Sequence, residues 1–175
     1  MRYFDFRRFS IYYDPYLVIS ITLLSILGLF FLYSASDGSS SVLIKQTVFV
    51  FFGLTLMIIL SQPDPQIYYS YSGFLLLISM ILVLIAIFFG PEINGANRWI
   101  SFGFITLQPS ELCKIFLPIF IASYLYGVSL PINLKNTFLT IFLIFIVFLT
   151  VAAQPDLGTA IVILLSGLYV LFLAG

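Results

Sequence analysis

Six long apolar segments divide this chain and limit the folds open to it. They cover residues 16–36, 42–60, 72–89, 109–126, 137–153 and 159–174. A helix needs about 20 mostly apolar residues to cross a bilayer, with a range of about 17–25. Backbone polar groups in lipid must be satisfied inside the segment, and these runs are too long and too evenly apolar for barrel strands. The sequence therefore predicts an all-α, polytopic membrane helix bundle of about six transmembrane helices, forming a single membrane domain over residues 1–175.

Composition excludes several classes of function. The chain is 62% hydrophobic and 8% charged, whereas a soluble domain carries about 25% charged residues. Seven basic residues balance seven acidic ones, so no basic face is available and we expect no nucleic-acid partner. There is no His and one Cys, Cys113, which removes imidazole bases, internal disulfides and multi-Cys metal sites. We expect no metal site and no cofactor in this chain.

The placement of Lys and Arg predicts the orientation in the membrane. The basic residues expected inside are Arg2, Arg7, Arg8 and Lys135. Cytoplasmic segments carry an excess of Lys and Arg, and the first helix usually dominates, so we expect a cytoplasmic N-terminus. The loops 37–41, 90–108 and 154–158 then face outward. The long loop 90–108 concentrates polar side chains on that face.

The segment Gln108-Pro109-Ser110-Glu111 with Lys114 is the first candidate for chemistry. Pro is favoured in the first turn of a helix, so a helix is expected to begin here. Glu111 and Lys114 are three residues apart and share one helix face. Ionisable groups within the membrane are costly alone and often functional. Two readings follow, either an ion pair that only fastens the helix to its neighbours or part of a polar pocket open to the outside.

The segment Gln154-Pro155-Asp156-Leu157-Gly158-Thr159 is the second candidate. Asp156 is a good N-cap for the last helix, where a negative charge is favoured. A cap alone contributes about 1 kcal/mol. The other reading is a carboxylate held in a cavity for a substrate, or for Lys114 or Arg98, and the residues leave both open.

Two further segments carry weaker signals. Asn94-Gly95-Ala96-Asn97-Arg98-Trp99 contains an Asn-Gly turn signal, and the planar fork of Arg98 suits phosphate or carboxylate groups. An interfacial Arg-Trp anchor is the alternative. Lys45 and Gln46 open the second apolar segment, where a snorkelling Lys is the simpler interpretation.

Taken in order, these segments resemble the SEDS family of bacterial shape, elongation, division and sporulation proteins. The resemblance includes Tyr33-Ser34-Ala35-Ser36 and the closing Leu171-Phe172-Leu173-Ala174-Gly175, and it extends from about Leu29 to the last residue. The short loops are more similar to the rod-shape-determining RodA branch than to the divisome FtsW branch. The resemblance implies a peptidoglycan glycosyltransferase of the bacterial cytoplasmic membrane that polymerises lipid II at the outer face. It also implies a class B penicillin-binding protein as partner.

The resemblance places no catalytic residue in this chain. The family's proposed base is an Asp in an outer loop well after the sixth span, so we expect an N-terminal part of a longer protein, inactive alone, and the metal need of the whole enzyme stays open. Asp156 matches a pocket Asp of the family. The expected pocket residues are Arg98, Glu111, Lys114, Asp156, Lys45, Gln46, Trp99, Gln108, Ser110, Gln154 and Thr159.

The chemistry of lipid II suggests a role for several of these side chains. Its pyrophosphate needs cations near the outer interface, and Arg98, Lys45 and Lys114 are available. Glu111 and Asp156 are expected to orient Lys114 or to bind sugar hydroxyls. A flippase for the lipid-linked precursor, using the same charged pair along a translocation path, is the main alternative. A noncatalytic scaffold for a cell-wall synthase is the third reading.

Overall fold

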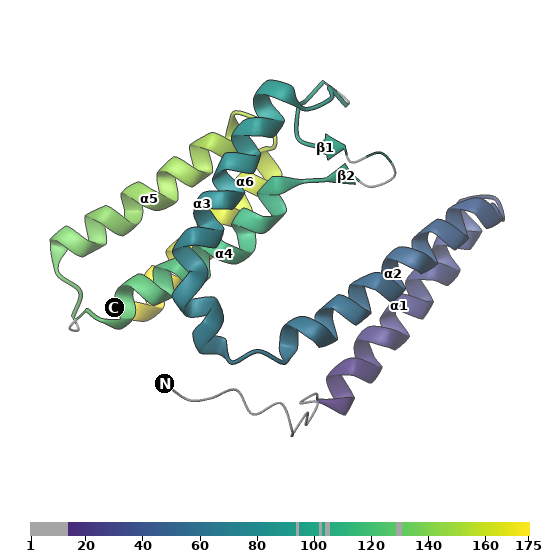
Figure 1. Cartoon of the computed structure of the whole chain (residues 1–175), viewed down its shortest axis with the longest axis horizontal. Coiled ribbons are helices and arrows are strands. Elements are labelled where there is room, and N and C mark those ends of the chain that lie inside the picture. Colours follow the sequence, from purple (N-terminus) through teal and green to yellow (C-terminus); the bar gives the residue numbers. More distant parts are fainter. Residues whose placement is uncertain (1–13, 94, 102, 104–105, 129–130) are drawn as a thin grey trace. The chain divides into compact units, whose positions relative to one another are not determined.

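The computed structural model describes residues 14–93, 95–101, 103, 106–128 and 131–175. The expected inside residues Arg2, Arg7 and Arg8, and Asn94 of the Asn-Gly signal, lie outside the described residues. Six helices and one pair of short strands are present in the described part (Figure 1). The elements are α1 (Pro15–Ala35), α2 (Ser40–Ser61), α3 (Pro65–Phe89), β1 (Ile100–Ser101), β2 (Thr106–Leu107), α4 (Pro109–Tyr126), α5 (Leu134–Ala152) and α6 (Leu157–Ala174). The all-α polytopic prediction is confirmed.

Five of these helices are long and apolar enough to cross a membrane. The remaining helix, α4, is not apolar enough. It is 18 residues long, but Glu111 and Lys114 lower its mean hydropathy. The described part therefore contains six helices, as predicted, and five of them qualify as membrane spans by length and composition.

The start of α3 differs most from the prediction. The apolar run begins near Ser72, yet the helix begins at Pro65, and only residues 62–64 separate it from α2. Pro suits a first helical turn because its missing N–H is not needed there. The Ser70 hydroxyl donates to the Gln66 carbonyl at 2.8 Å, so a polar residue of the supposed loop is satisfied inside the helix. Tyr and Ser residues at this end are helical despite their polarity.

The chain divides into two compact units, Met1–Asp64 and Pro65–Gly175. In the first unit α1 and α2 pack against each other. Asp14 caps α1, because its Oδ1 accepts from the Tyr16 N–H at 2.9 Å. No described residue of either helix is buried. The prediction of a single membrane domain is not tested by this division and stays a prediction.

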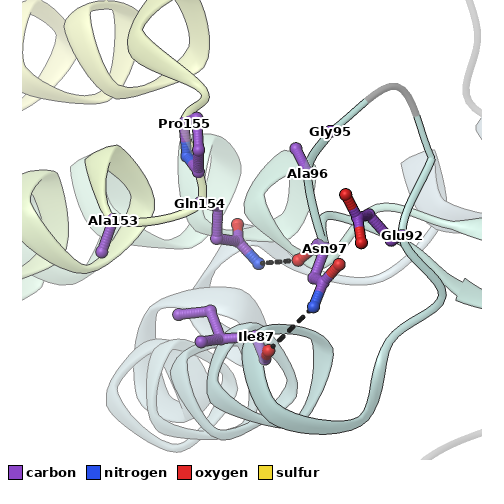
Figure 2. A pocket seen from close by; sticks show the side chains of 8 residues that line it. All are labelled: Ile87, Glu92, Gly95, Ala96, Asn97, Ala153, Gln154 and Pro155. Atoms are coloured by element: carbon purple, nitrogen blue, oxygen red, sulfur yellow. Dashed lines mark hydrogen bonds between the residues drawn. The ribbon is translucent and has the colours of Figure 1, made fainter.

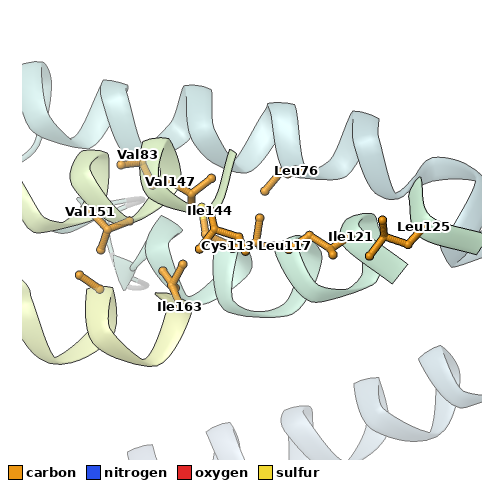
Figure 3. Close-up of a cluster of buried hydrophobic side chains, with 11 residues drawn as sticks. Leu76, Val83, Cys113, Leu117, Ile121, Leu125, Ile144, Val147, Val151 and Ile163 are labelled. Atoms are coloured by element: carbon orange, nitrogen blue, oxygen red, sulfur yellow. The ribbon is translucent and has the colours of Figure 1, made fainter. Parts of the chain in front are cut away.

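In the second unit α3 to α6 run alternately in opposite directions, with α4 packed against α3 and α6, and α5 against α6 (Figure 1). One face of α4 supplies buried side chains at every fourth position, a spacing that keeps them on one face of the helix. The core residues are Leu76, Val83, Cys113, Leu117, Ile121, Leu125, Ile144, Val147, Val151, Ala160 and Ile163 (Figure 3). Close packing of this kind holds helices together in lipid.

Alternation of direction brings two connections to the same end of the second unit. The α3–α4 connection holds the β1–β2 hairpin, with Ile100 paired to Leu107, a feature that the sequence pattern does not predict. The α5–α6 turn contains Gln154, Pro155 and Asp156. Gly90 directly follows α3, at a point where a Cβ would stand 2.7 Å from the Trp99 carbonyl oxygen. The missing side chain lets the connection fold back over the end of α3.

Candidate functional site

Asp156 lies at the first turn of α6 with both carboxylate oxygens engaged. Its Oδ1 accepts from the Thr159 N–H at 3.3 Å, which confirms the predicted N-cap. Its Oδ2 accepts from Gln108 Nε2 at 2.7 Å, and Arg98 Nη1 lies 4.0 Å from Oδ1. The residue is 8% exposed. A nearly buried carboxylate is therefore held between the helix N-terminus, an amide and a guanidinium.

Arg98 directs its fork at the backbone of the α5–α6 turn. Its Nε donates to the Gln154 carbonyl at 3.1 Å and its Nη2 to the Pro155 carbonyl at 2.6 Å. These contacts join two segments about 57 residues apart in sequence. Much of the donor capacity of Arg98 is thus directed at protein carbonyls, and its expected role toward pyrophosphate stays a prediction.

Gln154 is buried at the centre of the same end of the bundle. Its Nε2 donates to the Val83 carbonyl of α3 at 3.3 Å and to the Asn97 carbonyl at 3.2 Å. Because both acceptors are carbonyls, the amide nitrogen must face them, which fixes the orientation of the side chain. Its Oε1 is buried and has no hydrogen-bond partner among the described residues. Gln154 therefore ties three segments together and keeps one acceptor unused.

These side chains form what we call the polar network: Asn97, Arg98, Gln108, Gln154 and Asp156. Its members come from the α3–α4 connection, the cap of α4 and the α5–α6 turn. Asn97 contributes through Nδ2, which donates to the Ile87 carbonyl at 3.4 Å (Figure 2). The three sequence segments selected from the second unit thus meet at one end of the bundle.

A cavity of about 300 Å³ adjoins the polar network (Figure 2). Its lining residues are Ile87, Glu92, Gly95, Ala96, Asn97, Ala153, Gln154 and Pro155. The polar side chains in this wall are one carboxylate and two amides, and the amide nitrogens of Asn97 and Gln154 already donate to carbonyls. Oxygen acceptors therefore prevail, so the cavity suits hydroxyl, amide N–H or ammonium groups. Sequence reasoning missed Glu92, although the concentration of polar residues in its loop was a usable signal.

Glu111 and Lys114 pair as their spacing predicts, with Lys114 Nζ 2.6 Å from Glu111 Oε1. Their side chains are 52% and 28% exposed, and neither lines the cavity. Among the described residues, no hydrogen bond or ion pair links this pair to Asp156 or Arg98. The pair therefore lies beside the polar network rather than in it.

The remaining predicted residues have separate placements. Trp99 is half-buried beside Arg98, and Thr159 contributes its backbone N–H to Asp156. Ser110 is fully buried, and its hydroxyl has no partner among the described residues. Lys45 and Gln46 are exposed on α2 in the first unit, with Lys45 Nζ 6.0 Å from the Phe49 ring centre. Their membership of a shared pocket stays a prediction. Within the described part, no three Cys, Asp or Glu side chains gather as a possible metal site.

Comparison with known proteins finds one matching family model and many relatives. The model for FtsW, RodA and SpoVE, described as cell cycle proteins, matches residues 15–175. The peptidoglycan glycosyltransferase MrdB of Escherichia coli K12 is 36% identical over 166 residues, covering 95% of this chain and 45% of that protein. A probable peptidoglycan glycosyltransferase FtsW of Coxiella burnetii is 33% identical over 175 residues, covering 93% of this chain and 47% of the relative. The chain thus spans about half the length of these curated relatives.

Solved structures agree with the fold. The crystal structure of the rod shape determining protein RodA of Thermus thermophilus matches with a TM-score of 0.86 and 30% identity, over 95% of this chain and 55% of that one. A chain from a peptidoglycan synthase complex that coordinates polymerization and crosslinking matches with a TM-score of 0.85 and 31% identity. That match covers 93% of this chain and 48% of its counterpart.

Proposed function

The chain belongs to the FtsW/RodA/SpoVE family, and from that membership we propose that it forms part of a peptidoglycan glycosyltransferase that polymerises lipid II in the machinery of cell elongation and shape. The five apolar helices and the relatives identify it as a multi-pass inner-membrane protein. Relatives named as peptidoglycan glycosyltransferases support the reaction class. Similarity to RodA structures supports the elongation branch.

The observation that carries the proposal is the meeting of three separate segments in the polar network. Gln108 and Asp156 are 48 residues apart, and Arg98 lies 57 residues from Pro155. Burying a carboxylate is costly unless donors surround it. An N-cap needs contacts only with the first turn of α6, whereas Asp156 also accepts a hydrogen bond from Gln108 and pairs with Arg98. That additional engagement supports a site in which the carboxylate has a fixed position.

We assign the sugars of lipid II to the acceptor-rich cavity. Sugar hydroxyls and N-acetyl N–H groups are donors, and Glu92, Asn97 and Gln154 offer oxygens to them. The pyrophosphate needs cations, and the Lys114 ammonium group, unlike the Arg98 guanidinium, is not directed at backbone carbonyls. In this assignment Arg98 is a positioning residue that holds the turn carrying Asp156. Glu111 orients Lys114 through their ion pair.

The membrane orientation and the partner follow from the same proposal. We place the N-terminus in the cytoplasm and the polar network at the outer face, where lipid II is polymerised. A class B penicillin-binding protein is the proposed partner, supported by the similarity to a chain of a peptidoglycan synthase complex. The catalytic base is proposed to come from sequence beyond these residues, so this chain supplies pocket walls and positioning groups.

The test is to separate the charge of Asp156 from its capping role. Asn is as good an N-cap as Asp, so Asp156→Asn keeps the cap of α6 and removes the charge. Asp14→Asn is the matched control, because Asp14 caps α1 in the same way. The complete gene product with its partner is reconstituted in vesicles, and polymerisation of labelled lipid II is measured at equal protein levels.

We expect Asp156→Asn to lower the polymerisation rate by roughly 10–100-fold, the range given by a lost hydrogen bond to a charged group. Asp14→Asn is expected to retain the rate. Full activity of Asp156→Asn would reduce Asp156 to a cap. If the unsubstituted protein translocates the lipid II head group and forms no polymer, the protein is a flippase and not a polymerase.

A further inference from the structure

A second cavity, separate from the polar network, lies between α4 and α5. It has a volume of about 200 Å³ and is lined by Phe120, Ile121, Tyr124, Leu139, Thr140 and Leu143. Tyr124 is 39% and Leu139 46% exposed, so the cavity opens on the outside of the helix pair. Its walls are apolar apart from Thr140 and the hydroxyl of Tyr124. In a membrane protein such an opening faces acyl chains.

The Thr140 hydroxyl lacks the backbone hydrogen bond that five other helical threonines form. Thr22, Thr47, Thr55, Thr137 and Thr150 each donate to the carbonyl four residues earlier. The Thr140 hydroxyl is buried, and it has no partner among the described residues. The residue itself is only 2% exposed. A donor without an acceptor in an apolar wall costs free energy, and an occupant that supplies a carbonyl would remove that cost.

The rim of this cavity is polar and carries a positive charge. The Tyr124 hydroxyl donates to Asn136 Oδ1 at 3.0 Å, one helical turn, about 5.4 Å, from Thr140. Lys135, which is exposed, lies four residues before the lining residue Leu139 and therefore on the same face of α5. The sequence between Lys114 and Asp156 contains no acidic residue. Lys135 also forms no ion pair among the described residues, so its charge favours an anionic group.

We propose that the α4–α5 cavity binds an anionic glycerophospholipid. The phosphate lies at the rim near Lys135, the ester carbonyl accepts from the Thr140 hydroxyl, and an acyl chain lies against Leu139, Leu143 and Phe120. The order of cation, donor and apolar wall along α5 matches the order of phosphate, ester and acyl chain in such a lipid. A polyprenyl phosphate has a phosphate and an apolar chain but no ester carbonyl, so it fits the site less well.

The test is lipid binding by the complete gene product in detergent, followed by native mass spectrometry during titration with phosphatidylglycerol, phosphatidylcholine or a polyprenyl phosphate. Thr140→Val removes the hydroxyl at nearly constant shape. Thr150→Val is the matched control, because the Thr150 hydroxyl on the same helix is already satisfied. Thr140→Ser keeps the donor, and Lys135→Gln removes the charge from an exposed position.

We expect Thr140→Val to weaken phosphatidylglycerol binding about fivefold, the worth of one net hydrogen bond. Thr140→Ser and Thr150→Val are expected to bind as the unsubstituted chain does. Lys135→Gln should lower binding of phosphatidylglycerol and leave that of phosphatidylcholine unchanged. Without lipid, Thr140→Val should unfold no earlier than the unsubstituted chain. Unchanged binding by Thr140→Val, an equal loss in Thr150→Val, or equal binding of the polyprenyl phosphate would each overturn the proposal.

Discussion

Gln154 offers the sharpest test of the polar network, because two substitutions of similar size should have very different effects. Gln154→Leu removes the two hydrogen bonds to the Val83 and Asn97 carbonyls. Each contributes about 1 kcal/mol. The same change removes the buried Oε1 that has no hydrogen-bond partner among the described residues, and this raises the free energy of unfolding by about 1 kcal/mol. The net loss expected for Gln154→Leu is therefore only about 1 kcal/mol.

Gln154→Glu keeps the shape and reverses the chemistry. A carboxylate oxygen would replace Nε2 and face two carbonyl oxygens, so both donors are lost and a charge is buried without a partner. Leaving a buried charge uncompensated costs about 3–5 kcal/mol. Gln154→Glu is therefore expected to be less stable than Gln154→Leu by at least about 2 kcal/mol.

Trp99 makes this difference measurable near the site. It is the sole Trp of the chain and follows Asn97 by two residues, so its fluorescence reports on the same connection. The free energy of unfolding is measured by denaturant titration of the chain in detergent, using Trp99 emission. Gln46→Leu, at an exposed position on α2, serves as the control. Equal stabilities for Gln154→Glu and Gln154→Leu would show that Gln154 does not donate to the two carbonyls.

Three further substitutions test local geometry by thermal unfolding of the chain. Gly90→Ala should cost about 2 kcal/mol, since its Cβ would meet the Ala86 carbonyl oxygen and stand 2.7 Å from the Trp99 carbonyl oxygen; wild-type stability would mean that the connection does not fold so closely over α3. Gly167→Ala should cost less, about 1 kcal/mol, because the gain of about 1 kcal/mol for Ala over Gly inside a helix offsets part of the cost of displacing Ile144 Cγ1, which would stand 2.8 Å from the new Cβ; a larger loss than for Gly90→Ala would contradict this. Asp156→Ala loses both the N-cap and the hydrogen bond from Gln108, so it should cost about 2 kcal/mol. Asp156→Asn keeps the cap and should cost about 1 kcal/mol less, so equal losses would argue against capping.

Helix boundaries could be predicted where the sequence carries a local signal. Gln108-Pro109 places the start of α4 at the residue where the structure has it. The predicted start of α3 was seven residues too late. The prediction followed hydropathy, and the first residues of this helix are polar although they are helical. The strands β1 and β2 are two residues each, too short to produce an alternating pattern. Local chemistry is readable from sequence, whereas the length of a polar helix end is not.

The site divides in the same way. The Glu111–Lys114 pair and the Asp156 cap depend on residues three apart in one helix, so spacing alone predicts them. The Gln108–Asp156 hydrogen bond joins residues 48 apart, and its formation depends on how four helices pack. Arg98 shows the limit most clearly, since its residue type suits phosphate as well as the carbonyls that it contacts. Only the three-dimensional arrangement identifies which partner it meets.

The product formed from purified lipid II decides whether the protein is a peptidoglycan glycosyltransferase. The complete gene product is reconstituted in vesicles, alone and with its partner, and incubated with fluorescent lipid II. The products are separated by gel electrophoresis before and after digestion by lysozyme. We expect a ladder of glycan strands that lysozyme removes, and a much weaker ladder from Asp156→Asn after the same incubation time. Absence of any polymer from the unsubstituted protein, with or without its partner, would contradict the assignment as a peptidoglycan glycosyltransferase.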